Sequence, residues 1–172
     1  KFKLKVQESF ITIENINNTL EKNKINGEIG ILSIDIDGND YWIWKAINQV
    51  DPQIIVIEYN ARFGKTNSVS IPYEEKFNRS NNKKSKNIIY GASLEALHKL
   101  GKSKGYSLIG TNLNGNNAYF IKNKYQPVIK PVSLIKGFVS AKSRDERDSA
   151  GNLLFSSRES SIEAIRGLPV FN

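Results

Sequence analysis

The chain has 172 residues, no cysteine and a formal net charge of +8. This length suits one domain with its own core, and the lack of cysteine excludes disulfides, thiolate chemistry and cysteine-based zinc sites. No apolar run reaches the roughly 18 residues of a membrane span, and no signal peptide is apparent, so we expect a cytoplasmic protein without membrane partners.

The positive charge does not by itself indicate nucleic-acid binding. Lysines are scattered among many asparagines, and the densest stretch lies at 81–86 (NNKKSK). No aromatic residues interleave with this stretch, so it offers no stacking platform for bases. We therefore expect a solvated loop there, and a small molecule as partner in preference to a nucleic acid.

Apolar periodicity predicts alternating helices and strands in the first half of the chain. The run IGILSIDI and the run IIVIEY have the length and β-rich composition of buried strands. Either Asn39 or Asp40 is a plausible N-cap for the helix between them. In chain order we expect a weak strand at 2–6, a helix from 12 or 14 to 23, a strand at 29–36, a helix at 41–50 and a strand at 54–59.

A long polar stretch at 60–87 precedes the second half, and a loop of this length is usually functional. A helix is expected at 93–104, followed by strands at 106–111 and 118–122. The dipeptide Asn114-Gly115 between these strands predicts an antiparallel hairpin. From residue 125 prolines and glycines break the pattern, and a last short helix is expected at 160–166.

The order of elements predicts an α/β fold with a Rossmann-like sheet. Strand–helix–strand units with continuous apolar strands imply parallel strands covered on both faces, and the hairpin adds an antiparallel edge. We expect the α/β domain at 1–124 and an irregular extension, packed on the sheet, at 125–172.

Acidic side chains follow the two strongest strands. Asp35 and Asp37 lie at the end of the first strand, where the alternation of side chains along a strand places both on the same face. Glu58 and Asn60 lie at the end of the second strand. Ligands of open α/β sheets bind beyond the carboxyl ends of the strands, so these four are the candidate catalytic residues. If the two strands are neighbours, Asp37 and either Glu58 or Asn60 converge at one crevice. A carboxylate pair there can orient a hydroxyl or amine, take its proton or hold a divalent cation, for which Asp35 and Asp37 are the candidate ligands. Alternatively, such residues cap the following helix.

Four neighbouring residues are candidate substrate contacts. Asn39 and Asp40 lie in the acidic turn, and Tyr90 and Ser93 precede the helix at 93–104. Helix N-termini attract anions, but we favour the role of an N-cap for Ser93.

Two families with acidic loops match the turn DIDGND only in part. Haloacid-dehalogenase-type phosphatases use Asp-x-Asp after a strand, but Thr or Val usually follows, and here Asn39 and Asp40 follow the glycine. A calcium loop needs a later glycine and a bidentate Glu at its twelfth position, where this chain has Ala46.

A better resemblance covers residues 10 to 122. The segments 14–47 (ENINNTLEKNKINGEIGILSIDIDGNDYWIWKAI), 52–64 (PQIIVIEYNARFG), 71–73 (IPY) and 90–121 resemble the later half of FkbM-like methyltransferases. That family has a helix, a strand ending in D-x-[DE]-G, a helix, a strand ending in Glu and Asn, and a closing hairpin. The matching positions are Asp35, Asp37, Gly38, Glu58 and Asn60.

The resemblance implies strands four to seven of a methyltransferase sheet, with S-adenosylmethionine as cofactor and a sugar or other small metabolite as acceptor. The glycine-rich turn and the acidic residue that hold the cofactor are not found upstream of Asp35, so the cofactor-binding residues are unknown. Because the chain also begins without a methionine, we expect the acceptor-side part of a longer enzyme, and weak or no cofactor binding by the chain alone.

A non-catalytic binding or assembly module is the alternative interpretation. A half sheet exposes an edge strand and an apolar face, which predicts pairing with a second copy or with the missing N-terminal half.

Overall fold

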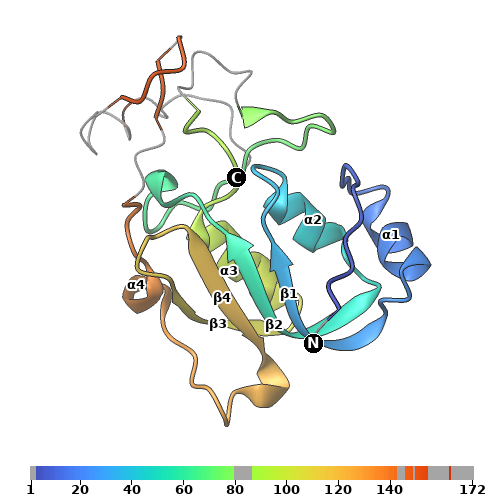
Figure 1. The fold of residues 1–172 in the computed structure, drawn as a ribbon. Coiled ribbons are helices and arrows are strands. Elements are labelled where there is room, and N and C mark those ends of the chain that lie inside the picture. The colour runs from blue at the N-terminus through green and yellow to red at the C-terminus, as the bar shows by residue number, and fades with distance from the viewer. Residues whose placement is uncertain (1–2, 80–86, 143–145, 149, 155–162, 164–172) are drawn as a thin grey trace.

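A computed structural model describes residues 3–79, 87–142, 146–148, 150–154 and 163. The order of elements is strand–helix–strand followed by a helix and a hairpin, as the sequence predicts (Figure 1). The helices are α1 (Ile16–Lys22), α2 (Asp40–Ala46), α3 (Leu94–Ser103) and α4 (Leu134–Gly137), with short 3₁₀ turns at Ala61–Phe63 and Asn123–Tyr125; the strands are β1 (Gly27–Ile34), β2 (Val50–Glu58), β3 (Tyr106–Thr111) and β4 (Asn117–Lys122).

The four strands form one open mixed sheet in the order β1-β2-β4-β3. β1 and β2 are parallel, whereas β4 is antiparallel to both β2 and β3, so three strands run in the same direction. The predicted hairpin is confirmed, with its second strand lying between β2 and the edge strand β3. The carboxyl ends of β1 and β2 therefore meet at one edge of the sheet, next to the amino end of β4.

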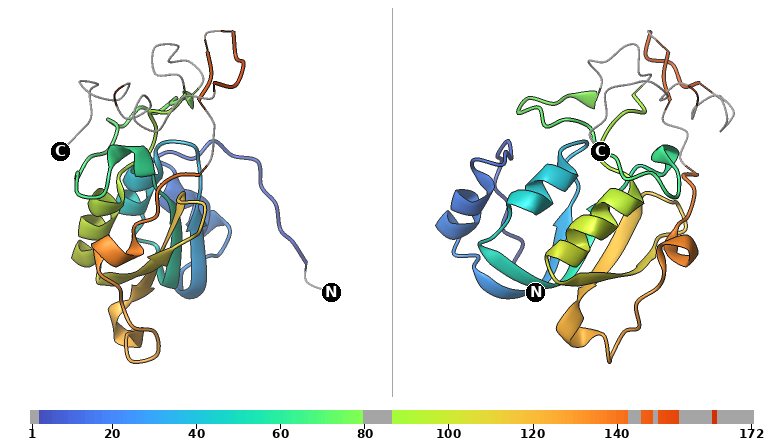
Figure 2. Two further views of the ribbon diagram at one scale, coloured as in Figure 1. Left: turned by 90° about the vertical axis from the view of Figure 1, so that its left-hand side faces the viewer. Right: turned by 180° about the vertical axis from the view of Figure 1, so that it is seen from behind.

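Helices α2 and α3 cover one face of the sheet, which lies behind the strands in Figure 1 and in front of them in the right panel of Figure 2. Trp44 of α2 is 2% exposed and packs against Phe120 of β4 with ring centroids 5.0 Å apart. On the strands, Ile31 is 64% exposed, while Ile54 and Val56 are only half-buried. The expectation that both faces are covered is therefore wrong, because a strip of apolar residues remains accessible.

Several predicted boundaries differ from the structure. β1 covers Gly27–Ile34 instead of 29–36, so Asp35 follows the strand. α2 ends at Ala46, where the Asn17 side chain from α1 donates to the Ala46 carbonyl and accepts from the amide of Asn48. β2 begins at Val50 and includes Pro52, which pairs with Ile29 of β1. No strand forms at residues 3–6; within 2–6, only residue 2 lies outside the described chain.

The first part of the C-terminal extension packs on the hairpin as expected. The amide of Val132 donates to the Leu108 carbonyl, and the Thr111 hydroxyl donates to the carbonyl of Gly137. The Tyr59 hydroxyl, at the end of β2, donates to the Val139 carbonyl over 2.6 Å. The extension thus closes the β3 side of the sheet, and the helix predicted at 160–166 lies outside the described residues apart from 163.

Within the described ranges, no helix combines the length and apolar character needed to cross a membrane.

Candidate functional site

The acidic turn after β1 is built around the side chain of Asp40. Its carboxylate accepts from the amide of Ile36 over 3.1 Å and from the amide of Gly38 over 3.0 Å. Asp40 is 1% exposed, and its burial raises the pKa of this carboxyl against the lowering effect of the two amides. Asp40 therefore holds the turn, and this conformation offers no exposed Asp40 atom to a substrate; its predicted substrate contact gains no support here.

Only glycine fits at position 38 of this turn, because the position has no room for a side chain. A Cβ at this position would lie 2.2 Å from the Phe77 ring, which comes from the long loop after β2. The glycine thus lets the loop close over the turn, and this links the acidic turn to residues that sequence patterns did not connect with it.

We expect Gly38→Ala to destabilise the protein by about 1–3 kcal/mol in urea unfolding, since the aromatic ring must move. Gly30→Ala on β1 is the matched control, because nothing lies within 4 Å of its added carbon. The double variant Gly38→Ala, Phe77→Leu should lose less stability than the sum of the losses in the two single variants. Equal stability of the two glycine variants would show that the ring does not pack there.

Three carboxylates meet at the ends of β1 and β2. Asp35, Asp37 and Glu58 each place an oxygen within 4.8 Å of the others. Asp35 is exposed and the Asp37 side chain is 77% exposed, whereas Glu58 is 9% exposed. Asp37 has a left-handed backbone with φ of 60°, which Asp tolerates better than most residues. The predicted convergence of the acidic strand ends is thus present, and Asn60 lies outside the cluster.

Glu58 is the buried member of this acidic cluster. Its Oε2 atom has no hydrogen-bond partner among the described residues. Burial is the main cause that raises the pKa of Glu58 to about 8, and the charges of Asp40 and Asp35 add to the rise. At neutral pH this carboxyl is therefore largely protonated unless a cation joins the cluster.

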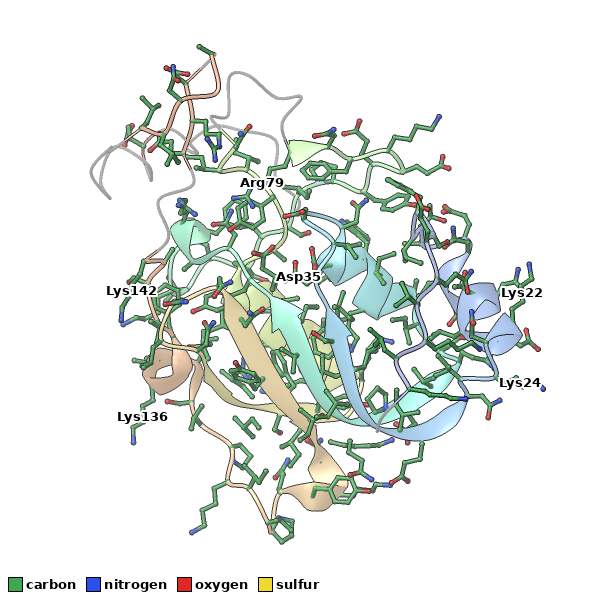
Figure 3. All side chains as sticks on the ribbon, in the orientation of Figure 1. Lys22, Lys24, Asp35, Arg79, Lys136 and Lys142 are labelled. Carbon is green, nitrogen blue, oxygen red and sulfur yellow. The ribbon has the colours of Figure 1, made fainter. Side chains whose placement is uncertain are left out.

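Arg79 approaches the cluster from the loop and was not found by sequence reasoning. Its Nη1 lies 3.6 Å from Asp37 Oδ1, and its Nε donates to the Asn87 carbonyl over 2.6 Å. The guanidinium also stacks 3.7 Å above the centre of the Tyr90 ring. Figure 3 shows Arg79 and Asp35 at the same end of the sheet. No local pattern marks this residue, because it lies within a polar stretch rich in Asn and Lys.

Asn60 is fully buried and serves the loop. Its Nδ2 donates to the carbonyls of Ile88 and Tyr90 over 2.8 and 3.1 Å, and its Oδ1 accepts from the amide of Arg62. Every polar atom of the side chain thus has a partner in the protein. The prediction of a catalytic Asn60 gains no support from this arrangement, which makes the residue a structural tie.

The other predicted substrate contacts are also buried. Ser93 caps α3 by accepting from the amide of Ala96, which supports the capping interpretation. Tyr90 is 3% exposed and its ring lies under Arg79. Asn39 donates to the carbonyl of Glu74, and its Oδ1 has no hydrogen-bond partner in the described part of the chain. None of these three side chains is exposed at the surface.

Two hollows lie away from the acidic cluster. One of about 190 Å³ opens between the amino end of β2 and α2, where Lys104 donates to the Ile47 carbonyl and Tyr106 donates to that of Pro52. The other, of about 240 Å³, lies between the N-terminal segment and α1. Neither hollow is lined by Asp35, Asp37 or Glu58.

No protein-family model matches the chain, and neither a curated protein nor a solved structure is significantly similar to it.

Proposed function

We propose that the chain is the acceptor side of an S-adenosylmethionine-dependent methyltransferase domain. The observation that carries the proposal is the meeting of Asp35, Asp37 and Glu58 at the carboxyl ends of adjacent parallel strands. Two parallel strands followed by a closing antiparallel hairpin also agree with the element order that the FkbM-like resemblance implies for strands four to seven.

The acidic cluster suits an acceptor that carries hydroxyl groups, as in a sugar or a related small metabolite. The exposed carboxylates of Asp35 and Asp37 can accept hydrogen bonds from two hydroxyls and orient them. A carboxylate within hydrogen-bond reach can also take the proton of the reacting oxygen, which makes that oxygen a better nucleophile. We thus assign acceptor binding and proton acceptance to Asp35 and Asp37. Glu58 is the buried carboxylate beside them.

The residues described here do not fit the cofactor itself. None of the strands β1 to β4 is followed by a turn with several glycines, whose amides would approach the cofactor carboxylate. We therefore assign no residue to S-adenosylmethionine and propose that another polypeptide segment supplies that side.

The test is methyl transfer by the natural gene product, expressed with any coding sequence directly upstream, from radiolabelled S-adenosylmethionine to hydroxylated metabolites. We expect Asp37→Asn to lower kcat/KM for the acceptor by about 100-fold or more, while cofactor affinity stays unchanged. Asn keeps the left-handed backbone at this position, so the change removes charge without strain.

Glu21→Gln on α1 is the control for loss of an exposed charge, and should retain full activity. The proposal fails if the gene and its neighbours encode no glycine-rich strand–turn–helix, or if the Asp37→Asn enzyme methylates at the normal rate.

A non-catalytic assembly module is the second candidate, favoured by exposed apolar side chains in the N-terminal segment and on β1. Leu4, Val6, Phe10 and Ile31 are 89%, 79%, 62% and 64% exposed. Stable self-association by light scattering, combined with no methyl transfer, would favour this candidate; a strictly monomeric chain would count against it.

A further inference from the structure

We propose that Asp35, Asp37 and Glu58 bind one divalent cation of the Mg²⁺, Mn²⁺ or Ca²⁺ class. This inference deepens the proposed function and rests on it for the use of the ion in acceptor binding. The binding itself requires only the three carboxylates, and so it is testable without any methyl-transfer assay.

The spacing of the ligand atoms fits a single ion. Three carboxylate oxygens lie within 4.8 Å of one another. Calcium–oxygen distances of about 2.3–2.6 Å place two ligands of one ion at most about 5 Å apart. Magnesium, at about 2.1 Å, limits this separation to roughly 4.2 Å. The cluster thus accepts Ca²⁺ with little movement, and closes slightly around Mg²⁺ or Mn²⁺ by rotation of the exposed Asp side chains.

The buried oxygen of Glu58 is the second observation that points to a ligand. This Oε2 is shielded from solvent and has no hydrogen-bond donor in the described ranges. A buried carboxylate oxygen without a partner costs free energy, which a bound cation offsets. One oxygen of the Glu58 carboxylate lies within 4.8 Å of oxygens of Asp35 and Asp37, so an ion bound to this carboxylate is shared with them.

The ligand set determines the class of ion. Three carboxylates and no sulfur or imidazole favour hard cations over zinc or copper. Arg79 lies against Asp37, so one guanidinium faces three carboxylates and leaves negative charge for a cation to neutralise. Asp35 and Asp37 are exposed, so the solvent side of the ion stays open for water or for hydroxyl oxygens of the acceptor.

The test titrates the full chain with Mn²⁺ and follows bound ion by water proton relaxation, with Mg²⁺ and Ca²⁺ as competitors. We expect one Mn²⁺ per chain at this cluster. Asp37→Asn and Glu58→Gln should each weaken binding at least tenfold, and both changes preserve side-chain shape. Glu21→Gln on α1 removes an exposed charge elsewhere and should leave the affinity unchanged.

Circular dichroism confirms that each variant is folded before titration. The inference is overturned if the folded chain binds no Mn²⁺ below about 1 mM, or if both cluster variants bind as tightly as the natural sequence. Cation binding without methyl transfer would reject only the proposed function, whereas methyl transfer without cation binding would reject only this inference.

Discussion

Replacing Asn60 with alanine should destabilise the protein by about 2–4 kcal/mol in urea unfolding, since it breaks two buried hydrogen bonds and a third that is partly buried. The carbonyls of Ile88 and Tyr90 would lose their donor, and the amide of Arg62 would lose its acceptor. Each unpaired buried group costs about 1–3 kcal/mol, although losses at neighbouring groups do not add fully.

The effect of Asn60→Ala should spread to the loop that approaches the acidic turn. Tyr90, which Asn60 holds through its carbonyl, is the residue on which Arg79 stacks. Hydrogen exchange of the amides at 87–93 should therefore accelerate in this variant. Asn48→Ala, at an exposed position, is the control and should change stability by less than about 0.5 kcal/mol. If Asn60→Ala proves as stable as this control, the three bonds are not formed.

Replacing Glu58 with glutamine should stabilise the protein at pH 8 in the presence of a chelator. The pKa of Glu58 is raised to about 8 in the folded protein from 4.5, mainly by burial. The protonated carboxyl stabilises the fold fully below pH 4.5, and this contribution is lost as the pH rises through 8. Because of Glu58, the free energy of unfolding of the natural protein should therefore fall by on the order of 4 kcal/mol across this window. The glutamine variant has no charge to bury at this position, so it should not show this loss.

Urea unfolding at several pH values between 5 and 8.5 measures this effect of roughly 1 kcal/mol per pH unit. The curves for Glu58→Gln and the natural protein should meet near the acidic end and separate as the pH rises. Glu21→Gln should run parallel to the natural protein. A constant difference between Glu58→Gln and the natural protein at all pH values would show that Glu58 does not titrate as described.

The strands of the sheet could be predicted from local sequence signals. Apolar β-rich runs located β1 and β2, and the Asn-Gly pair located the hairpin between β3 and β4. Because parallel strands end at the same edge, the sequence also predicted that Asp37 and Glu58 approach each other. These features depend on periodicity and chain direction, which a sequence carries directly.

The remaining features depend on contacts between distant segments. Asn17 ends α2 through a bond across 29 positions, and Arg79 reaches Asp37 from a loop without a recognisable pattern. Asn60 illustrates a second limit, since an asparagine after a strand serves equally as a ligand or as a tie for a loop. Only the positions of the Ile88 and Tyr90 carbonyls decide between these roles.

Anomalous diffraction from crystals of the chain soaked in Mn²⁺ tests most directly whether a ligand binds at this edge of the sheet. One anomalous peak is expected within about 2.5 Å of oxygens from Asp35, Asp37 and Glu58. Diffraction that shows the three carboxylates turned apart, with no manganese between them, would contradict the account.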